Sequence, residues 1–433
     1  MDKTSRARYA APLALALLAG AAHAAPFGFF DPRSAAMGGT GVSSGNSDNA
    51  SFLNPALLSL PRDGERFGLN LPIVSVHAAD PDKLLDDVDK LKSAGDSLTN
   101  AINAFNAAIG PLPNVPLQAA SGQLALALNN FRTELNKVNS KALTGDLFAA
   151  PITVAVPGKT LGFGAHAAAR ADVGAEFVYA SSDNAFLQNL STLASNYAGS
   201  GSSTDLNNLV TSSGFGTGTQ ITDPTLNSQV KLRGLVQEEI GVSFAHQFAS
   251  LGDTAIGVTP KQVKYITLDY VVSPQHANIT IDQGKKEYSG SNLDFGVAKE
   301  LGSGFRAGLV GKNMVKKSFT TALGNQIELK PQYRAGISHH TGWTTVAIDL
   351  DLTKNDPIGL EKATQFAAIG AEFDLLGWLQ LRVGYRSDRT GNYKGLPSAG
   401  IGIALFKSLH IDAAIAARGK EEAMAAVQLG LRF

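Results

Sequence analysis

The feature that most constrains the fold is an alternation of apolar and polar residues that recurs from Arg66 to the end of the chain. In the last segment Val427, Leu429, Leu431 and Phe433 alternate with residues that are polar or glycine. A period of two places successive side chains on opposite faces of a β-strand. The same pattern occupies 161–177, 345–352 and 379–386. We therefore expect a β-sheet protein.

Alternation alone does not distinguish a soluble sandwich from a membrane barrel, because the polar face can point outward or inward. Three features favour the barrel. Many alternating segments run for about ten residues, the length that crosses a bilayer. Short and long connections alternate along the chain. The chain ends within its last strand on Phe433, which we expect to be the C-terminal assembly signal. Arg382 and Arg386 would cost roughly 2–4 kcal/mol each if they faced lipid near the midplane, so the polar face should line a lumen.

The pattern predicts an all-β transmembrane barrel of about 14 antiparallel strands, an even number as in bacterial single-chain barrels. The predicted strands are 66–77, 150–157, 160–180, 234–249, 254–273, 290–301, 305–317, 331–341, 343–353, 364–375, 378–388, 396–406, 408–417 and 423–433.

Short turns are expected after every second strand, which should place them at the periplasmic end and the longer connections outside the cell. These turns are 157–159, 251–253, 301–304, 341–342, 376–377 and 407–408. Aromatic residues near them are typical of a membrane interface. They are Phe248, Phe305, Trp343, Trp378, Phe406 and Phe433. Strict alternation would nevertheless turn Trp343, Trp378 and Phe406 toward the lumen unless the turns reorient them.

Two insertions interrupt the barrel pattern. In 80–145 apolar residues recur at spacings of three and four on both sides of the break at 110–113, which predicts a helical hairpin over 82–142. By strand parity this hairpin should be extracellular. The second insertion, 182–232, is rich in Ser, Gly, Asn and Thr and is interpreted as a long, mobile loop with weak helical pieces.

The N-terminus has the pattern of a secretory signal peptide, residues 1–24. Lys3, Arg6 and Arg8 precede an apolar run that ends in Ala22-His23-Ala24, an A-x-A cleavage site. No later stretch is apolar over the length that a transmembrane helix needs. We expect export, cleavage after Ala24, and residence in the outer membrane of a Gram-negative bacterium.

Composition excludes several function classes. The chain has 37 basic and 37 acidic residues, which provides no basic surface for nucleic acid. It has no cysteine, which excludes thiolate metal sites, catalytic thiols and disulfides. His339 and His340 are strand neighbours that point to opposite faces, so they do not converge on a metal ion. No Ser-His-acid set is identifiable, and we expect no catalytic residue, no metal, no cofactor and no enzymatic activity.

The alternation assigns a set of charged side chains to the lumen. Both signs occur in it, so the set could form a salt-bridge network that rigidifies the barrel, or it could line a permeation path. The predicted lumen residues are Arg170, Asp172, Glu176, Glu239, Arg306, Lys312, Arg334, Asp349, Asp351, Glu372, Arg382, Arg386, Asp412 and Arg432.

Residues 25–65 precede the first strand and contain no strand pattern. The stretch from Arg33 to Val42 includes Met37-Gly38-Gly39-Thr40-Gly41, and Asn54-Pro55-Ala56 follows. These motifs resemble the N-terminal signature of the FadL-like outer-membrane superfamily. Asp31-Pro32-Arg33-Ser34, the helical hairpin and 257–261 resemble its TraF-type plasmid-transfer branch.

The resemblance implies a fourteen-stranded barrel over 66–433, with residues 25–65 folded into the lumen as a hatch. Glycines 38, 39 and 41 would let the backbone bend and approach the wall, and Asn54 before Pro55 suits a turn whose side chain caps backbone donors. The segment could be part of a gate or simply a structural plug.

Two functions follow from the resemblance. A TraF-type protein would be a non-enzymatic envelope component of conjugation that acts through partner contacts, with a protein partner at the hairpin 82–142. A FadL-like protein would passively transport hydrophobic small molecules such as long-chain fatty acids, with an apolar pocket near Phe27, Phe29, Phe30 and Met37; these side chains could equally be plug packing. Either protein would contact outer-membrane lipid and the barrel-assembly machinery.

Overall fold

The structure is a computed structural model. It describes residues 23–24, 28, 30–62, 65–212, 216–217, 220–272, 284–406 and 408–433. Most of the predicted signal peptide, and the predicted ligand residues Phe27 and Phe29, therefore lie outside the described residues.

Fourteen strands form a closed antiparallel barrel, as predicted. The barrel closes where β2 pairs with β20, with Gly68 opposite Arg432. Its strands are β2 (Gly68–Ala79), β3 (Ala142–Val156), β4 (Gly162–Val178), β7 (Gln229–Phe248), β8 (Thr254–Val272), β9 (Lys285–Gly302), β10 (Phe305–Lys312), β13 (Gln332–His340), β14 (Thr344–Asp351), β16 (Phe366–Leu375), β17 (Leu379–Asp388), β18 (Leu396–Leu405), β19 (Leu409–Arg418) and β20 (Glu422–Arg432).

Each predicted strand corresponds to one barrel strand, but some boundaries were wrong. β3 begins at Ala142, where we predicted 150, and β7 begins at Gln229, where we predicted 234. β9 begins earlier and β10 ends earlier than predicted. The added part of β9, residues 285–289, is largely polar on both faces, so the apolar–polar alternation that identifies a strand is lost there.

The outer wall is apolar and the inner wall is polar. On β17, Leu381 and Val383 are 42% and 51% exposed, whereas Arg382 between them is 2% exposed. The wall therefore has the lipid-facing exterior and polar interior of a membrane barrel. Among the described residues, no helix is both long enough and apolar enough to cross a bilayer.

The predicted short turns lie at one end of the barrel, called the turn end, where β2 begins and β20 ends, although the β19–β20 connection at the opposite end, residues 419–421, is also short. The aromatic side chains predicted for this end are exposed, from Phe248 at 37% to Phe406 at 94%. The turns do reorient the residues that strict alternation directs inward. Phe406 has a left-handed φ of 54°, and Trp343 packs against Phe373, whose side chain faces outward, with ring centroids 6.1 Å apart.

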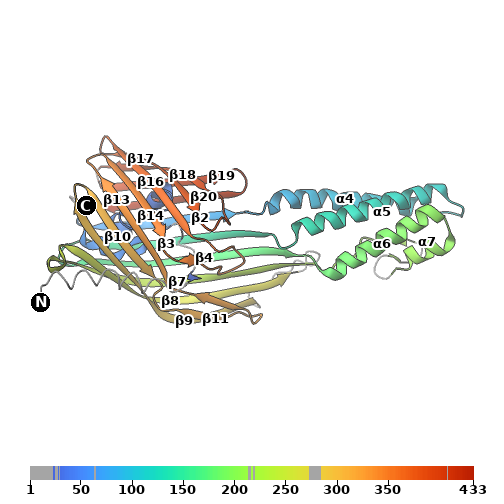
Figure 1. The fold of residues 1–433 in the computed structure, drawn as a ribbon, viewed down its shortest axis with the longest axis horizontal. Coiled ribbons are helices and arrows are strands. Elements are labelled where there is room, and N and C mark those ends of the chain that lie inside the picture. The colour runs from blue at the N-terminus through green and yellow to red at the C-terminus, as the bar shows by residue number, and fades with distance from the viewer. Residues whose placement is uncertain are drawn as a thin grey trace, which may run out of the picture.

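The insertions project from the opposite end, called the loop end, as an elongated helical domain (Figure 1). The predicted hairpin is confirmed: α4 (Leu84–Ala107) packs on α5 (Val115–Val138). For 182–232 we predicted a long loop with weak helical pieces, but the first part of that region forms two full helices, α6 (Ser181–Ser200) and α7 (Ser203–Val210). Leu187, Leu190, Ala194 and Tyr197 recur at helical spacing and are buried in a common core with α4 and α5. This partner surface stabilises a helix that composition alone did not indicate.

Short elements complete the fold. Inside the barrel lie α2 (Pro32–Ala36), η1 (Ser47–Asn49), α3 (Ala50–Leu53) and η2 (Pro55–Ser59). At the loop end, the hairpin of β11 (Lys317–Thr320) and β12 (Gln326–Leu329) packs on inward residues of β7 and β8 such as Tyr265. The remaining strands are β1 (His23–Ala24), β5 (Gly216–Thr217), β6 (Gln220–Ile221) and β15 (Lys354–Asn355).

One buried carboxylate joins the helical domain to the barrel. Asp183 in the first turn of α6 is 1% exposed and accepts hydrogen bonds from the backbone N–H of Asn227 at 2.9 Å and of Ser228 at 2.7 Å, just before β7.

We expect Asp183→Ala to loosen the base of α6, because each buried donor left without a partner costs about 1–3 kcal/mol. Hydrogen exchange should rise in 181–200 but not in the barrel strands. Asp223→Ala, at an exposed position of the same domain, is the control. Equal exchange in both variants would contradict this role.

Candidate functional site: the barrel interior

Residues 30–62, called the interior segment, occupy the barrel interior. Its α2 contacts β17, β18, β19 and β20, its η1 contacts β2 and β3, and its η2 contacts β4, β7, β8 and β9. These strands lie on different sides of the closed barrel. The segment therefore lies across the lumen.

Local capping fixes the turns of the interior segment. Asp31 caps α2 by accepting a hydrogen bond from the Ser34 N–H at 3.0 Å, and Pro32 occupies the first helical position. Asn54 caps η2 by accepting from the Ala56 N–H at 3.1 Å, with Pro55 at the corresponding place. The fixed φ of proline suits the first position of a helix. An Asp or Asn side chain just before it accepts a hydrogen bond from a backbone N–H of the first turn that has no partner within the helix.

Of the predicted hatch glycines, Gly38 lies directly against the wall, at the backbone of Tyr385 and Ile369. Gly38 and Gly39 have φ values of +73° and +90°, which other residues adopt only with strain. A Cβ atom on Gly384 of β17 would lie 2.1 Å from the Gly38 nitrogen, and one on Gly370 of β16 would lie 2.4 Å from atoms of Met37. Backbone therefore packs on backbone, without side chains between them.

Further wall glycines face the interior segment in the same way. A Cβ at any of them would come within 2.7 Å of a backbone or side-chain atom of the segment. They are Gly162 and Gly164 of β4, Gly257 of β8, Gly296 of β9, Gly308 of β10 and Gly400 of β18.

Two predicted lumen residues hold the glycine motif by its backbone. Asp349 Oδ2 accepts hydrogen bonds from the N–H groups of Gly41 at 2.8 Å and Val42 at 2.9 Å. Arg334 pairs with Asp351 at 2.6 Å and donates to the Gly39 carbonyl oxygen at 3.0 Å.

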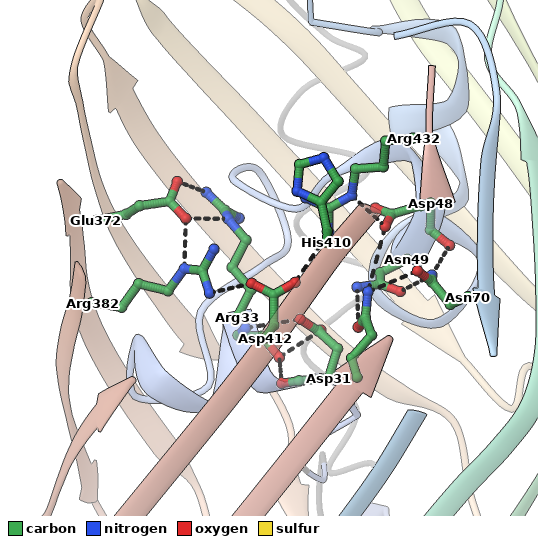
Figure 2. Close-up of polar contacts among 12 residues, drawn as sticks. Asp31, Arg33, Asp48, Asn49, Asn70, Glu372, Arg382, His410, Asp412 and Arg432 are labelled. Atoms are coloured by element: carbon green, nitrogen blue, oxygen red, sulfur yellow. Dashed lines mark hydrogen bonds and ion pairs between the residues drawn. The ribbon is translucent and has the colours of Figure 1, made fainter. Parts of the chain in front are cut away.

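A chain of ion pairs fastens the turn-end part of the segment (Figure 2). Glu372 binds Arg33 of the segment at 2.7 Å and Arg382 of the wall at 2.7 Å. Arg382 continues to Asp412 at 2.6 Å. On the other side of Asp412, Arg432 binds Asp48 of the segment at 2.8 Å.

Arg306, at the turn end of β10, donates a hydrogen bond to the Leu60 carbonyl oxygen at 3.1 Å, whereas several other predicted lumen residues lie nearer the loop end. Arg170 pairs with Asp172 at 2.7 Å, and Arg386 pairs with Glu422 at 3.1 Å. Glu176 is half-exposed near the end of β4. The predicted set thus separates into residues that hold the interior segment and residues around the loop-end mouth.

Of the predicted apolar ligand residues, the two that the structure describes, Phe30 and Met37, pack into the structure and do not line an apolar cavity. Phe30 contacts Phe148 edge-on with ring centroids 5.3 Å apart, and Lys312 lies over its ring at 4.0 Å. Met37 is fully buried against the wall at Gly370. The cavity beside Phe30 measures about 40 Å³ and is also lined by charged side chains such as Lys261 and Glu239.

Sequence reasoning missed the wall glycines. The sequence pattern could have indicated them, because inward positions of strands with apolar–polar alternation are occupied by glycine. These are Gly336, Gly370, Gly384 and Gly400. A glycine where a lumen side chain is expected indicates a close backbone approach. The polar partners Asn70, Ser398 and Gln428, which bind the segment or its neighbours, were missed as well.

We expect Gly384→Ala to prevent the interior segment from seating, because the new Cβ would overlap its backbone. Limited proteolysis should then cleave within 30–62, and the heat stability of the folded barrel should fall. Gly342→Ala is the matched control, since a Cβ there meets nothing within 4 Å. Similar behaviour of the two variants would argue against backbone seating.

We expect Glu372→Gln to destabilise the barrel by about 3–5 kcal/mol, because it leaves two buried arginines without their shared carboxylate. Urea unfolding in detergent micelles measures this free energy. Glu287→Gln removes an exposed pair with Lys264 and should cost at most about 1 kcal/mol. A Glu372 variant as stable as the control would exclude the ion-pair chain as a fastening.

We compared the chain with solved structures, with curated proteins and with protein-family models. Solved structures similar to this chain include the Pseudomonas putida toluene transporter TodX, at 14% identity, coverage of 94% of this chain and 99% of that chain, and a TM-score of 0.48. The Ralstonia pickettii toluene transporter TbuX is similar at 14% identity, coverage of 93% and 98%, and a TM-score of 0.48. None of the curated proteins matches the chain.

A family model described as "F plasmid transfer operon, TraF, protein" matches residues 51–351. With that match across more than half of its length, the chain belongs to the TraF family of the F plasmid transfer operon.

Proposed function

We propose that the protein is a non-enzymatic outer-membrane component of a conjugal-transfer apparatus, exported with a signal peptide that is cleaved after Ala24. It acts by presenting its helical domain to a protein partner. The apolar exterior of the barrel and the family membership support this proposal. The observation that carries it is a filled lumen combined with a projecting helical domain.

The filled lumen favours a structural barrel. The interior segment touches wall backbone through glycines of both partners, and its buried Arg33 and Asp48 are paired with wall residues. Moving it would break these pairs and leave buried charges uncompensated, which is costly. We infer that the segment is a permanent plug and that the barrel is a rigid membrane anchor.

The base of the helical domain is fixed to the barrel by polar contacts. Lys141, just before β3, donates hydrogen bonds to Asp87 of α4 at 2.6 Å and to the Asp82 carbonyl oxygen at 2.8 Å. The hydrogen bonds from Lys141 and Lys90 lower the pKa of Asp87 to about 2. Such a base orients the domain relative to the membrane.

The distal hairpin is the surface we assign to the partner. From Ser97 to Phe131 it has no charged residue, whereas the insertion's lysines and Arg132 lie nearer the barrel. Val115 and Leu126 are 70% and 64% exposed on this uncharged part. An uncharged surface with exposed aliphatic groups suits apolar protein contact better than electrostatic steering.

A deletion strain tests the assignment. Loss of plasmid transfer with normal growth on long-chain fatty acids is the expected outcome. Loss of fatty-acid growth with normal transfer would reject the conjugation role and favour the alternative, passive transport of hydrophobic molecules.

A disulfide cross-link between the segment and the wall distinguishes a permanent plug from a hatch that moves. Ser51 Oγ of the segment lies 2.8 Å from Ser243 Oγ of β7, and the chain has no cysteine. We expect Ser51→Cys/Ser243→Cys to form a disulfide that leaves plasmid transfer unchanged. Inhibition that is reversed by a reductant would show that the segment must move. Each single cysteine variant is the control.

Surface variants test the partner contact. Val115→Glu with Leu126→Glu should abolish transfer without changing barrel assembly, because charges at an apolar contact must be desolvated. The control Lys92→Glu with Ser93→Glu, at exposed positions nearer the barrel, should have little effect. Retained transfer in the Val115/Leu126 variant would remove this surface from the proposal.

A further inference from the structure

A cavity at the loop-end mouth lies above the interior segment and has no role in seating it. It measures about 60 Å³ and is formed by the ends of β2 and β3, the middle of β4 and the loops after β15 and β17. Residues that line it include Asp146, Asp172, Glu361, Phe366 and Tyr393. A cavity of this size holds a few waters or a small polar group.

One carboxylate of this cavity is incompletely satisfied. Asp172 is 5% exposed, and Arg170 Nε and Nη2 both donate to its Oδ1, at 3.2 Å and 2.7 Å. Its Oδ2 is buried and has no hydrogen-bond partner among the residues that the structure describes. A buried carboxylate oxygen without a donor is costly unless a ligand or water supplies one.

Most of the other charged groups that line the cavity are paired, and His77 lies 2.6 Å from Asp146 and 2.9 Å from Glu422. Arg386 pairs with Glu422 at 3.1 Å, and Lys362, which also lines the cavity, pairs with Asp82 at 2.6 Å. Glu361 accepts a backbone N–H of Gly359 at 2.8 Å, and within the described ranges no cation lies at ion-pair distance from it. A ligand with donors and a positive charge would complement these groups.

The walls favour an organic cation over a metal ion. The rings of Phe366 and Tyr393 line the cavity, and the guanidinium of Arg386 already lies 4.1 Å from the Phe366 centroid. Hard divalent cations require many oxygen ligands, and over the described part of the chain no group of three or more His, Asp or Glu could hold a metal. An alkylammonium group has three donors and an apolar stem that suits the rings.

We propose that this cavity binds a primary ammonium group through Asp172 Oδ2, from either a small free amine or a lysine side chain of another protein. This inference does not depend on the conjugation role.

Titration of the full-length protein in detergent micelles tests the site. By calorimetry, n-butylamine should bind, and n-butanol and butyrate should not. A peptide with blocked ends and one lysine distinguishes the sources: binding of the amine identifies a free ligand, and binding of the peptide alone identifies a protein side chain. Both results support the site, and binding of neither overturns it.

Variants locate the binding. Asp172→Asn should weaken binding about 10- to 100-fold, by loss of a charge-assisted hydrogen bond. Asp269→Asn is the matched control, because Asp269 is also buried and paired with an arginine but does not line the cavity. If Asp172→Asn does not fold, Thr144→Met fills the cavity without removing a charge and should abolish binding. Unchanged affinity in Asp172→Asn or Thr144→Met would overturn the proposal.

Discussion

Contact between two backbones is the constraint on which this structure depends. The interior segment lies so close to the wall that a Cβ on Gly384, Gly370 or Gly296 would overlap its atoms. Only glycine permits such an approach, and the left-handed turns at Gly38 and Gly39 bring the segment into it. The barrel interior is thereby filled by main chain as well as by side chains.

Polar groups make that filling stable inside a membrane barrel. The segment has buried backbone donors and acceptors that need hydrogen-bond partners. Wall residues such as Asp349 and Arg334 supply these partners. Two of its charges, Arg33 and Asp48, are neutralised by Glu372 and Arg432. A buried network with some partners missing is destabilising. Removing a charge from either the wall or the segment would therefore leave the opposite charge buried without a partner and lower the stability of the barrel.

The loop end has a different character from this closed centre. There the helical domain projects away from the barrel, and a cavity with an unsatisfied carboxylate remains at the mouth. A rigid interior and an elaborated loop end together suit a barrel that displays binding surfaces. This division supports partner contact as the main role and adds an ammonium site beside it.

The sequence by itself determined the barrel, its fourteen strands, the lumen-facing charges and the first helical hairpin, because each is encoded in a local period of two or about 3.6 residues. Tertiary structure alone decided the rest. α6 forms where composition indicated a loop, since Leu187 and Tyr197 are buried only when α4 and α5 are present. The pairings of Arg33 with Glu372 and Arg432 with Asp48 join residues more than 300 positions apart, so no local pattern specifies them. The same holds for the glycine contacts and the mouth cavity, which exist only after the barrel has closed around the segment.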